Sequence, residues 1–291
     1  MVRTYSQLYL DARKALIPTE GADMAGQIAR NLLCAISKKS HEQILLERGI
    51  YASEDICDGM DRAVVRIQNG EPLAYVIGEW DFYGLTLYVD RNVLIPRDDT
   101  CAVTELAIAK VSRMGKDPRV LDLCTGSGCI GLAIASKVKD ARVTLGDISR
   151  EALAVAKKNV IKHHLSARVS CFPVNALEAP APVLGKFDLI VSNPPYITTG
   201  EMLELPKSVK GFEPHLALHG GVDGLDFYRA IAANYRSALK PGGYLCFEFG
   251  MGQGDAVCEI LKHEGYTILE RTRDYNEIER ACLAQFGRKE D

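Results

Sequence analysis

The sequence predicts an α/β fold: a seven-stranded, mostly parallel, Rossmann-like sheet with an antiparallel edge hairpin, plus a small N-terminal all-α domain joined by a β-hairpin. Three observations predict this fold. Apolar strand-like runs alternate with amphipathic helical segments from about residue 98 onward. The last two strand-like runs have no long helix between them, which favours an antiparallel pair at one edge. The first 70 residues or so carry helical periodicity instead.

Three helices are expected in the N-terminal part, at residues 5–17, 21–36 and 55–70. One face of the first two is made by apolar residues spaced four apart, namely Leu8, Ala12 and Leu16, then Met24, Ile28 and Leu32. Aromatic and β-branched residues alternate around Gly84, which predicts a β-hairpin. We therefore expect a helical substrate-docking domain at 1–72, a β-hairpin connector at 73–97 and the α/β domain at 98–291.

The α/β domain is expected to alternate strands and helices. Strands are predicted at 119–124, 142–147, 168–174, 187–193, 241–249, 266–274 and 280–287. Helices are predicted at 100–114, 131–139, 150–164 and 224–240. Parallel strands with helices on both faces bind ligands outside the carboxyl ends of the strands, so candidate site residues are sought there.

The composition excludes some classes of protein. A formal net charge of −3 gives no basic excess, so we do not expect nucleic acid to be the partner. No apolar run approaches the roughly 18 residues of a membrane span, and the N-terminus is charged and amphipathic rather than a signal peptide. We expect a cytoplasmic monomer with no membrane partner.

The nine cysteines form no CxxC pair and no framework spacing, which indicates buried thiols in a reducing compartment rather than disulfides or a zinc site. His163 and His164 lack further ligands at helical spacing, so no metal is expected. The lysines around them, in 157–164, have no interleaved aromatic residues and are expected to form a solvated helix face rather than a nucleic-acid patch.

Residues 126–131, Gly-Ser-Gly-Cys-Ile-Gly, match the GxGxxG pattern, and Asp147 follows about 20 residues on, at the end of the next strand. The match is weak by itself, because any βαβ unit that binds a nucleoside needs glycines for close approach and a carboxylate for the ribose hydroxyls. A tight strand–helix turn is the alternative interpretation, but it would need neither Asp147 nor Asp122.

Asp122 lies four residues before Gly126, at the end of its predicted strand. A carboxylate there would repel a pyrophosphate at the helix N-terminus, and would suit the α-ammonium of an amino acid. This arrangement resembles the first motif of S-adenosylmethionine-dependent methyltransferases. The resemblance implies that Asp147 binds the ribose.

A second motif, Asn193-Pro194-Pro195-Tyr196, ends the predicted strand at 187–193. Two prolines fix the backbone in an extended form and remove two N–H groups. The side-chain oxygen of Asn193 and the main-chain oxygen of Pro194 then form a rigid pair of acceptors, and Tyr196 adds an aromatic face. We expect this pair to bind the two hydrogens of a planar NH2 group and to turn its lone pair toward a methyl donor.

Such a site needs no general base, because the product can lose its proton after the transfer. Catalysis would come from orientation and from acceptors that bind more strongly as positive charge develops on the nitrogen. Adenine N6, guanine N2 and a glutamine side-chain amide all present this NH2 edge, and the motif does not distinguish them.

The chain resembles the release factor glutamine methyltransferase family over nearly its whole length. The similar segments are 71–84, 93–100, 120–135, 147–159, 187–197, 212–229 and 239–250. Three of them, 71–84, 93–100 and 212–229, are particular to this family and to a close sister family that methylates a large-subunit ribosomal protein.

The resemblance implies methyl transfer from S-adenosylmethionine, with S-adenosylhomocysteine as product, to the glutamine amide in the Gly-Gly-Gln motif of peptide chain release factors, which would tune translation termination. Residues 98–291 would be the methyltransferase domain, and the helical domain would help to dock the release factor. The cofactor would be held by Asp122, Cys124, Thr125, Gly126, Ser127, Gly128, Asp147, Asn175, Ala176 and Asn193. Substrate would meet the residues Asn193, Pro194, Pro195 and Tyr196.

The chain departs from the family at three places. Cys124 stands where glycine is usual, which is tolerable if its φ is negative. Residues 98–101, Asp-Asp-Thr-Cys, replace a more usual Pro-Glu-Thr-Glu. Asn175 and Ala176 replace an acid and a large aromatic residue; Asn175 can still accept from an adenine amino group, but stacking at position 176 is lost.

Several alternatives stay open on the sequence alone. The acceptor could be a ribosomal protein, or a nucleic-acid adenine or guanine, although the chain has neither a basic excess nor an obvious recognition insert. A non-catalytic protein with a relic pocket would not need the intact aspartates and Asn-Pro-Pro-Tyr. Glu248 could be an acceptor behind the site or a solvated strand end, and Arg97 an ion-pair partner between domains.

Overall fold

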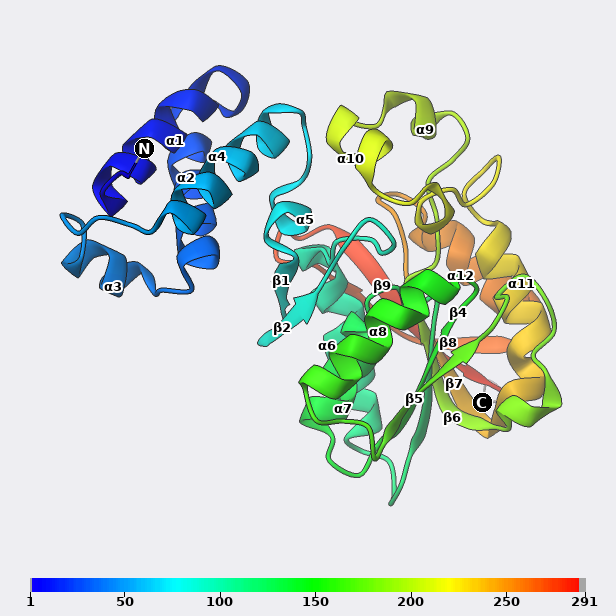
Figure 1. Cartoon of the computed structure of the whole chain (residues 1–291). Coiled ribbons are helices and arrows are strands. Elements are labelled where there is room, and N and C mark those ends of the chain that lie inside the picture. Colours follow the sequence, from blue (N-terminus) through cyan, green and yellow to red (C-terminus); the bar gives the residue numbers. More distant parts are fainter. Residues whose placement is uncertain (1, 288–291) are drawn as a thin grey trace. The chain divides into compact units, whose positions relative to one another are not determined.

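A computed structural model describes residues 2–287. The described chain divides into two compact units (Figure 1). The first unit runs to Glu79 and includes Lys207–Phe212; the second comprises Trp80–Pro206 and the chain from Glu213 onward. A two-stranded hairpin, β1 (Glu79–Phe82) with β2 (Leu85–Tyr88), begins at the division between them.

The first unit is all helical. Its helices are α1 (Tyr5–Glu20), α2 (Ala22–Ser37), α3 (His41–Leu46), α4 (Glu54–Gln68), α5 (Leu73–Ile77) and α10 (Lys207–Phe212). The faces of α1, α2 and α4 enclose an apolar core that includes Leu8, Leu16 and Leu32. Because these short helices are marginal alone, packing of this shared core is what stabilises them.

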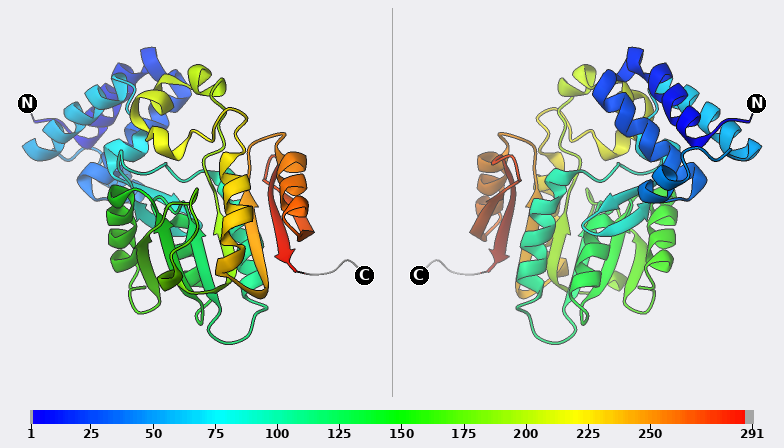
Figure 2. Two further views of the ribbon diagram at one scale, coloured as in Figure 1. Left: turned by 90° about the vertical axis from the view of Figure 1, so that its right-hand side faces the viewer. Right: turned by 90° about the vertical axis from the view of Figure 1, so that its left-hand side faces the viewer.

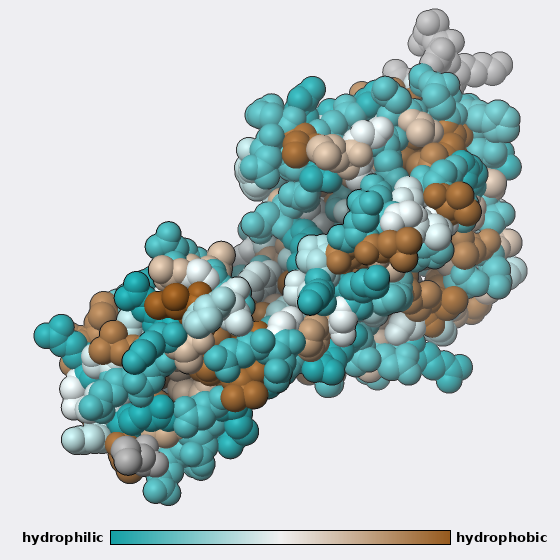
Figure 3. Space-filling model, turned by 90° about the horizontal axis from the view of Figure 1, so that it is seen from above, coloured by the Kyte–Doolittle hydropathy of each residue, from teal (hydrophilic) through white to brown (hydrophobic). Residues whose placement is uncertain are grey.

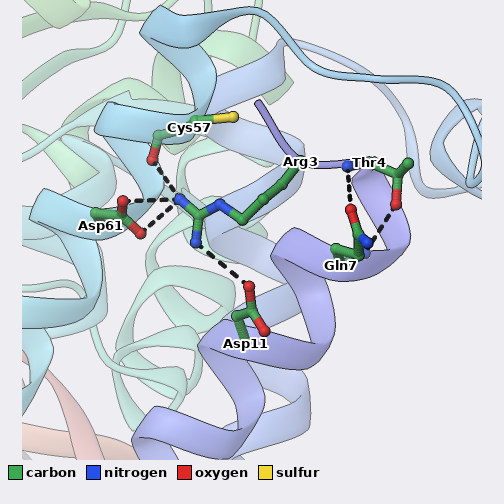
Figure 4. Close-up of polar contacts among 6 residues, drawn as sticks. All are labelled: Arg3, Thr4, Gln7, Asp11, Cys57 and Asp61. Carbon is green, nitrogen blue, oxygen red and sulfur yellow. Dashed lines mark hydrogen bonds and ion pairs between the residues drawn. The ribbon is translucent and has the colours of Figure 1, made fainter. Parts of the chain in front are cut away.

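Polar contacts at the start of the chain hold α1 to α4 (Figure 4). Thr4 and Gln7 form a capping box, in which each side chain bonds the other residue's backbone N–H. The Arg3 guanidinium donates to both carboxylate oxygens of Asp61 at 2.7 Å and to the Cys57 carbonyl at 3.3 Å. The capping box fixes where α1 begins, and Arg3 fixes which part of α4 lies beside it.

The structure differs from the sequence-based prediction in three details of this unit. Met24 is half exposed, at 50%, and the buried stripe of α2 is instead made by Ala25, Ile28, Ala29, Leu32 and Leu33. The stripe follows the i, i+3, i+4 pattern from Ala25, and position 24 lies at its edge. Helices α3 and α5 are additional elements, and α5 occupies residues expected to belong to the hairpin connector.

The second unit contains a seven-stranded sheet in the order β5-β4-β3-β6-β7-β9-β8 (Figure 1). The strands are β3 (Arg119–Leu123), β4 (Arg142–Asp147), β5 (Val169–Pro173), β6 (Phe187–Ser192), β7 (Leu239–Glu248), β8 (Tyr266–Arg273) and β9 (Glu279–Phe286). The first five are parallel, and β9 runs antiparallel to both β7 and β8. The predicted mostly parallel sheet with an antiparallel edge hairpin is confirmed.

Helices cover both faces of this sheet (Figure 2). One core lies between the sheet and α6 (Cys101–Val111), α7 (Cys129–Lys137) and α8 (Arg150–Lys162), and the other lies under α11 (Asp226–Asn234) and α12 (Gly254–His263). Successive residues of β6 alternate between the cores, with Leu189 and Val191 in the first and Ile190 in the second. Because the central strands are buried on both faces, their sequences are nearly continuous runs of apolar residues.

Among residues 2–287, the remaining short elements are α9 (Glu201–Glu204) and four 3-10 turns at Asp98–Thr100, Pro182–Leu184, His215–Ala217 and Tyr235–Ala238. Along the chain, β3, β4 and β5 are added in one direction and β6 and β7 in the other. The strand order therefore reverses between β3 and β6, the position at which open α/β sheets bind ligands beyond their carboxyl ends.

No helix among residues 2–287 is both long enough and apolar enough to cross a membrane. On the face drawn in Figure 3, apolar side chains occur in small groups separated by polar ones.

Candidate active site

A pocket lies beyond the carboxyl ends of β3, β4, β5 and β6, entirely within the second unit. Four groups of residues line it: 92–94, 96, 97 and 100; 124–127, 129 and 130; 147–149, 152 and 174–177; and Asn193, Pro195, Pro214, Leu216, Ala217 and Phe227. Nine of the thirteen predicted site residues line this pocket, which lies where the strand order reverses; the four that do not are Asp122, Gly128, Pro194 and Tyr196. Their individual positions differ from the sequence-based expectations in several ways.

The glycine loop, residues 124–128, turns the chain from β3 into α7. Gly126 has φ 54° and Gly128 has φ 86°, both left-handed. A Cβ built on Gly126 meets no atom within 4 Å, so this residue faces open space in the pocket, where a ligand can approach the backbone closely. Ser127 also lines the pocket, and its buried hydroxyl oxygen has no hydrogen-bond partner among the described residues.

Cys124 begins this loop with φ 60°. The condition under which a cysteine replaces glycine without strain, a negative φ, is therefore not met. A left-handed conformation costs a non-glycine residue roughly 1–2 kcal/mol. The structure thus identifies the cost of the substitution as backbone strain at the edge of the pocket.

Asp122 differs from its predicted position. The sequence predicts that its carboxylate meets a cation in the pocket, but the residue is fully buried and is not among the residues that line the pocket. Its Oδ2 accepts from the Thr125 hydroxyl at 2.6 Å and from the Gly131 N–H at 2.9 Å, and burial raises its pKa to about 7. Asp122 therefore lies beneath the loop and holds its shape.

Asp147 ends β4 and lines the pocket. One carboxylate oxygen accepts from the Gly126 N–H at 2.9 Å and the other from the Ser149 N–H at 3.0 Å. Burial raises its pKa, while these two bonds oppose the rise. Each oxygen has a second lone pair, so the carboxylate is oriented by the backbone and can still accept from hydroxyl groups.

Asn175 and Ala176 both line the pocket. The Asn175 side chain is already engaged: its Nδ2 donates to Glu178 at 2.8 Å and its Oδ1 accepts from the Leu177 N–H at 3.1 Å. Oδ1 keeps one lone pair for a ligand amino group. Ala176 is buried and offers no aromatic face.

The Asn-Pro-Pro-Tyr loop, residues 193–196, leaves β6. Asn193 and Pro195 line the pocket, whereas Pro194 and Tyr196 are not among its lining residues. Asn193 Nδ2 donates to the Thr100 hydroxyl at 3.3 Å, which leaves its Oδ1 as the acceptor available to a ligand. Among the described residues, no N–H donates to the Pro194 carbonyl.

Three groups from later in the chain fix the course of this loop. The Gln253 amide donates to the Tyr196 carbonyl at 3.0 Å, and Ile197 pairs with His219 as an isolated parallel bridge. A Cβ on Gly220 would lie 2.6 Å from the Pro195 oxygen, so only glycine fits against the loop here. Gly220 lies in the segment 212–229, which resembles the family, but the resemblance does not predict this contact.

Sequence reasoning also misses several residues that line the pocket. Ile148 and Leu177, about half exposed at 50% and 45%, offer apolar surface beside the residues expected to hold a nucleoside. Their position directly after Asp147 and Ala176 could have indicated them. The wall formed by 92–97 and 214–217 could not be found this way, because it brings distant segments together.

Arg97 belongs to that wall and pairs with Glu213, whose side chain is 1% exposed. Glu213 also accepts from the Ile95 N–H at 3.2 Å. Both residues lie in the second unit, so this pair joins the two halves of one pocket wall.

The residues present fit S-adenosylmethionine. Gly126 offers open space, Asp147 an oriented carboxylate, Ser127 an unpartnered hydroxyl, and Ile148 and Leu177 apolar surface. Among residues 2–287, no group of three or more His, Cys, Asp or Glu is arranged to hold a metal ion.

Two family models match parts of the chain. Residues 7–78 match the model of the PrmC N-terminal domain, and residues 99–205 match that of the methyltransferase small domain. The catalytic domain of hMettl16, solved in complex with the MAT2A 3′UTR hairpin 6, has a TM-score of 0.57 at 15% identity, covering 82% of this chain and 85% of that one; this likeness concerns the fold alone.

Two relatives are similar over most of their length. The release factor glutamine methyltransferase of Clostridium acetobutylicum is 41% identical over 74% of this chain and 75% of its own. That of Neisseria gonorrhoeae is 37% identical over 89% of this chain and 92% of its own. On this similarity, and with the methyltransferase sheet and its pocket in place, the chain belongs to the release factor glutamine methyltransferase family.

Proposed function

We propose that this enzyme transfers a methyl group from S-adenosylmethionine to the side-chain amide nitrogen of the glutamine in the Gly-Gly-Gln motif of peptide chain release factors. The observation that carries the proposal is the position of Asn193. Its amide lies at the pocket beside the glycine loop, with Nδ2 already donating to Thr100. The atom left for a substrate is an acceptor, as an NH2 group requires.

When bound, S-adenosylmethionine supplies an electrophilic methyl group on a sulfonium sulfur. In the proposed mechanism, Asp147 would accept hydrogen bonds from the ribose hydroxyls, and the glycine loop would let the backbone approach the cofactor closely. Asn193 Oδ1 would accept one N–H of the substrate amide. Pro194 is not among the lining residues, but its carbonyl directly follows Asn193 and has no donor among the described residues, so it would accept the other N–H. These two bonds orient the nitrogen lone pair and strengthen as positive charge develops.

Tyr196 has a different proposed role from the one expected at first. It is not among the lining residues, and its main-chain oxygen is held by Gln253. Burial raises the pKa of its phenol, so it stays neutral and acts as a packing surface behind the loop. In the transfer the sulfonium–methyl bond would break as the nitrogen–methyl bond forms, S-adenosylhomocysteine would be the leaving group, and the nitrogen would then lose one proton to water.

The first unit is proposed to dock the release factor. Exposed apolar residues lie at the end of α3 and just after it, where Leu46 is 87% and Tyr51 is 67% exposed. Apolar residues at this exposure are typical of interaction surfaces when they cluster. Since the proposed substrate takes part in bacterial translation, the proposed location is the cytoplasm, and a monomer suffices because one chain lines the whole pocket.

The experiment that tests the function is incubation with methyl-labelled S-adenosylmethionine and four acceptors. These are a bacterial release factor, the same factor with its Gly-Gly-Gln glutamine replaced by alanine, a large-subunit ribosomal protein, and unmodified nucleic acid. We expect label in the intact release factor alone. Label in the alanine variant or only in another acceptor would contradict the proposal.

A further inference from the structure

Glu248 is a buried carboxyl that the mechanism above does not use. It ends β7, the strand next to β6, and Phe247 is in register with Ser192, so Glu248 lies beside the start of the Asn-Pro-Pro-Tyr loop. The residue is 1% exposed, and its Oε2 has no hydrogen-bond partner among the described residues. Glu248 is therefore not a solvated strand end. Burying a carboxyl oxygen without a hydrogen-bond partner costs free energy, which indicates that this carboxyl has a role in the site.

Two side chains of the site lie close enough to this carboxyl to lower its pKa: Thr100 and Asn193. Thr100 is itself buried, at 2% exposed, and its position is fixed because its carbonyl accepts from the Thr104 hydroxyl at 2.8 Å. Asn193 Nδ2 also donates to the Thr100 hydroxyl. The three side chains thus form one group, in which Thr100 and Asn193 line the pocket and the Glu248 carboxyl lies behind them.

The chemistry of these groups determines which way the Asn193 amide points. An ionised carboxylate is acceptor-only, so it binds the hydroxyl hydrogen of Thr100 and leaves that oxygen to accept. The amide must then present its NH2 to Thr100 and Glu248. The reverse orientation would place Oδ1 against two acceptors and present donors to the substrate.

We propose that Glu248 is a positioning residue which, together with Thr100, holds the Asn193 amide with its oxygen toward the substrate nitrogen. This inference rests on the proposed function, because it concerns the same NH2 acceptor. The negative charge behind Asn193 also polarises its amide, which strengthens the hydrogen bond to a nitrogen that becomes positive during transfer.

The proposal has a consequence for pH. Burial raises the pKa of Glu248 to about 8, and the hydrogen bonds from Thr100 and Asn193 lower it. The other titratable groups that act on it or feel its charge are Asp99, Arg280, Tyr196, Tyr228, Cys101 and Cys129. As the pH falls through the pKa of Glu248, the carboxyl gains a proton, becomes able to donate, and no longer imposes the orientation of Asn193.

The test is Glu248→Gln, assayed on the release factor across about pH 6 to 9. A glutamine can present either an oxygen or an NH2 to Asn193, so we expect kcat to fall about 10- to 100-fold, with little change in the affinity for S-adenosylmethionine. The wild-type kcat should decline below about pH 8, and that decline should be absent from the variant. The matched control is Glu270→Gln, an exposed residue of β8.

A second pair of variants keeps the test decisive if Glu248→Gln does not fold. Thr100→Val removes the hydroxyl at constant volume, and Thr100→Ser restores it. We expect kcat to fall in the first and to recover most of the wild-type value in the second. Equal kcat values and pH profiles for the wild type, Glu248→Gln and Thr100→Val would overturn the inference. A wild type that does not label the release factor would instead overturn the proposed function.

Discussion

The glycine loop and the Asn-Pro-Pro-Tyr loop leave neighbouring strands, but they are held in different ways. Side chains hold the glycine loop from beneath: Asp122 accepts from Thr125, and Asn159 Nδ2 donates to the Ser127 carbonyl at 2.9 Å. The Asn-Pro-Pro-Tyr loop is held mostly through its main chain, by Gln253 and by the close approach of Gly220. The first loop is thus stabilised by side-chain hydrogen bonds from beneath it, and the second by contacts to its main chain.

Because the two loops are held differently, we expect mutations around them to have different effects. Changes under the glycine loop should affect stability and cofactor binding, because the loop is a rigid part of the core. Changes around the Asn-Pro-Pro-Tyr loop should affect turnover, because its shape sets the position of the reacting nitrogen. The following variants test that separation, from the largest expected effect to the smallest.

Asn193→Ala should have the largest effect. It removes the oriented oxygen proposed to bind the substrate N–H, and loss of such a group costs about 100- to 1,000-fold in kcat. Affinity for S-adenosylmethionine should change much less, which equilibrium binding can measure alongside steady-state kinetics. Asn276→Ala, at an exposed asparagine in the β8–β9 turn, is the control. Full activity of Asn193→Ala would exclude the acceptor mechanism.

Gly220→Ala should reduce turnover without removing any functional group. The added Cβ would lie 2.6 Å from the Pro195 oxygen and 2.7 Å from the Tyr196 Cα, so the loop must move. A displacement approaching 1 Å near reacting groups can cost about 100-fold in rate. We expect a fall in kcat of about 10- to 100-fold. Gly115→Ala, whose Cβ would meet no atom within 4 Å, should keep the wild-type rate.

If Gly220→Ala lowered the free energy of unfolding but left kcat unchanged, the loop would be tolerant of displacement. The expectation that changes around the Asn-Pro-Pro-Tyr loop affect turnover would then be wrong. Thermal unfolding measured beside the kinetics distinguishes these outcomes.

Asp122→Asn should change stability in a pH-dependent way. Burial raises the pKa of Asp122 from 3.8 to about 7, so the folded state binds a proton that the unfolded state releases. The resulting stabilisation is present below about pH 4 and is lost as the pH rises through about 7. The slope is at most about 1.4 kcal/mol per pH unit.

Asparagine can keep both bonds to Thr125 and Gly131 through its carbonyl oxygen, and it carries no charge at any pH. The variant should therefore gain free energy of unfolding over the wild type at pH 8 more than at pH 5. Urea unfolding at the two pH values measures the difference. Because Glu248 shifts in the same direction, part of the wild-type slope should persist in the variant. An unchanged slope would place the titration elsewhere.

The parts of the fold that could be predicted from sequence are those that local patterns determine. The seven strands, the glycine loop and Asp147 follow from local patterns, because apolar alternation and glycine spacing directly reflect the backbone they form. Helix α12 was missed although Val257, Cys258 and Leu261 carry helical spacing and are buried. Its start, in a glycine-rich stretch without a side-chain cap, gives no N-terminal signal.

The walls of the pocket could not be predicted in this way. Glu213 and Arg97 are 116 positions apart, and Thr100 and Asn193 are 93 apart. Such contacts depend on tertiary packing rather than on any spacing along the chain. Asp122 shows that a local motif does not determine where a side chain lies. The motif predicts its place at the end of β3, but its carboxylate lies under the loop instead of in the pocket.

Cys124→Gly should have the smallest effect, and an opposite sign. The left-handed conformation at φ 60° costs cysteine roughly 1–2 kcal/mol, which glycine avoids. Glycine increases the entropy of the unfolded chain, which offsets about 0.4–1 kcal/mol of that gain. We expect a net increase of about 0.5 kcal/mol in the free energy of unfolding, measured by urea unfolding. Cys171→Gly, in the extended strand β5, should instead lose stability, since no strain is relieved there. An equal loss of free energy of unfolding in both variants would mean that packing of the Cys124 side chain outweighs its backbone strain. This position of the glycine loop would then favour cysteine over glycine.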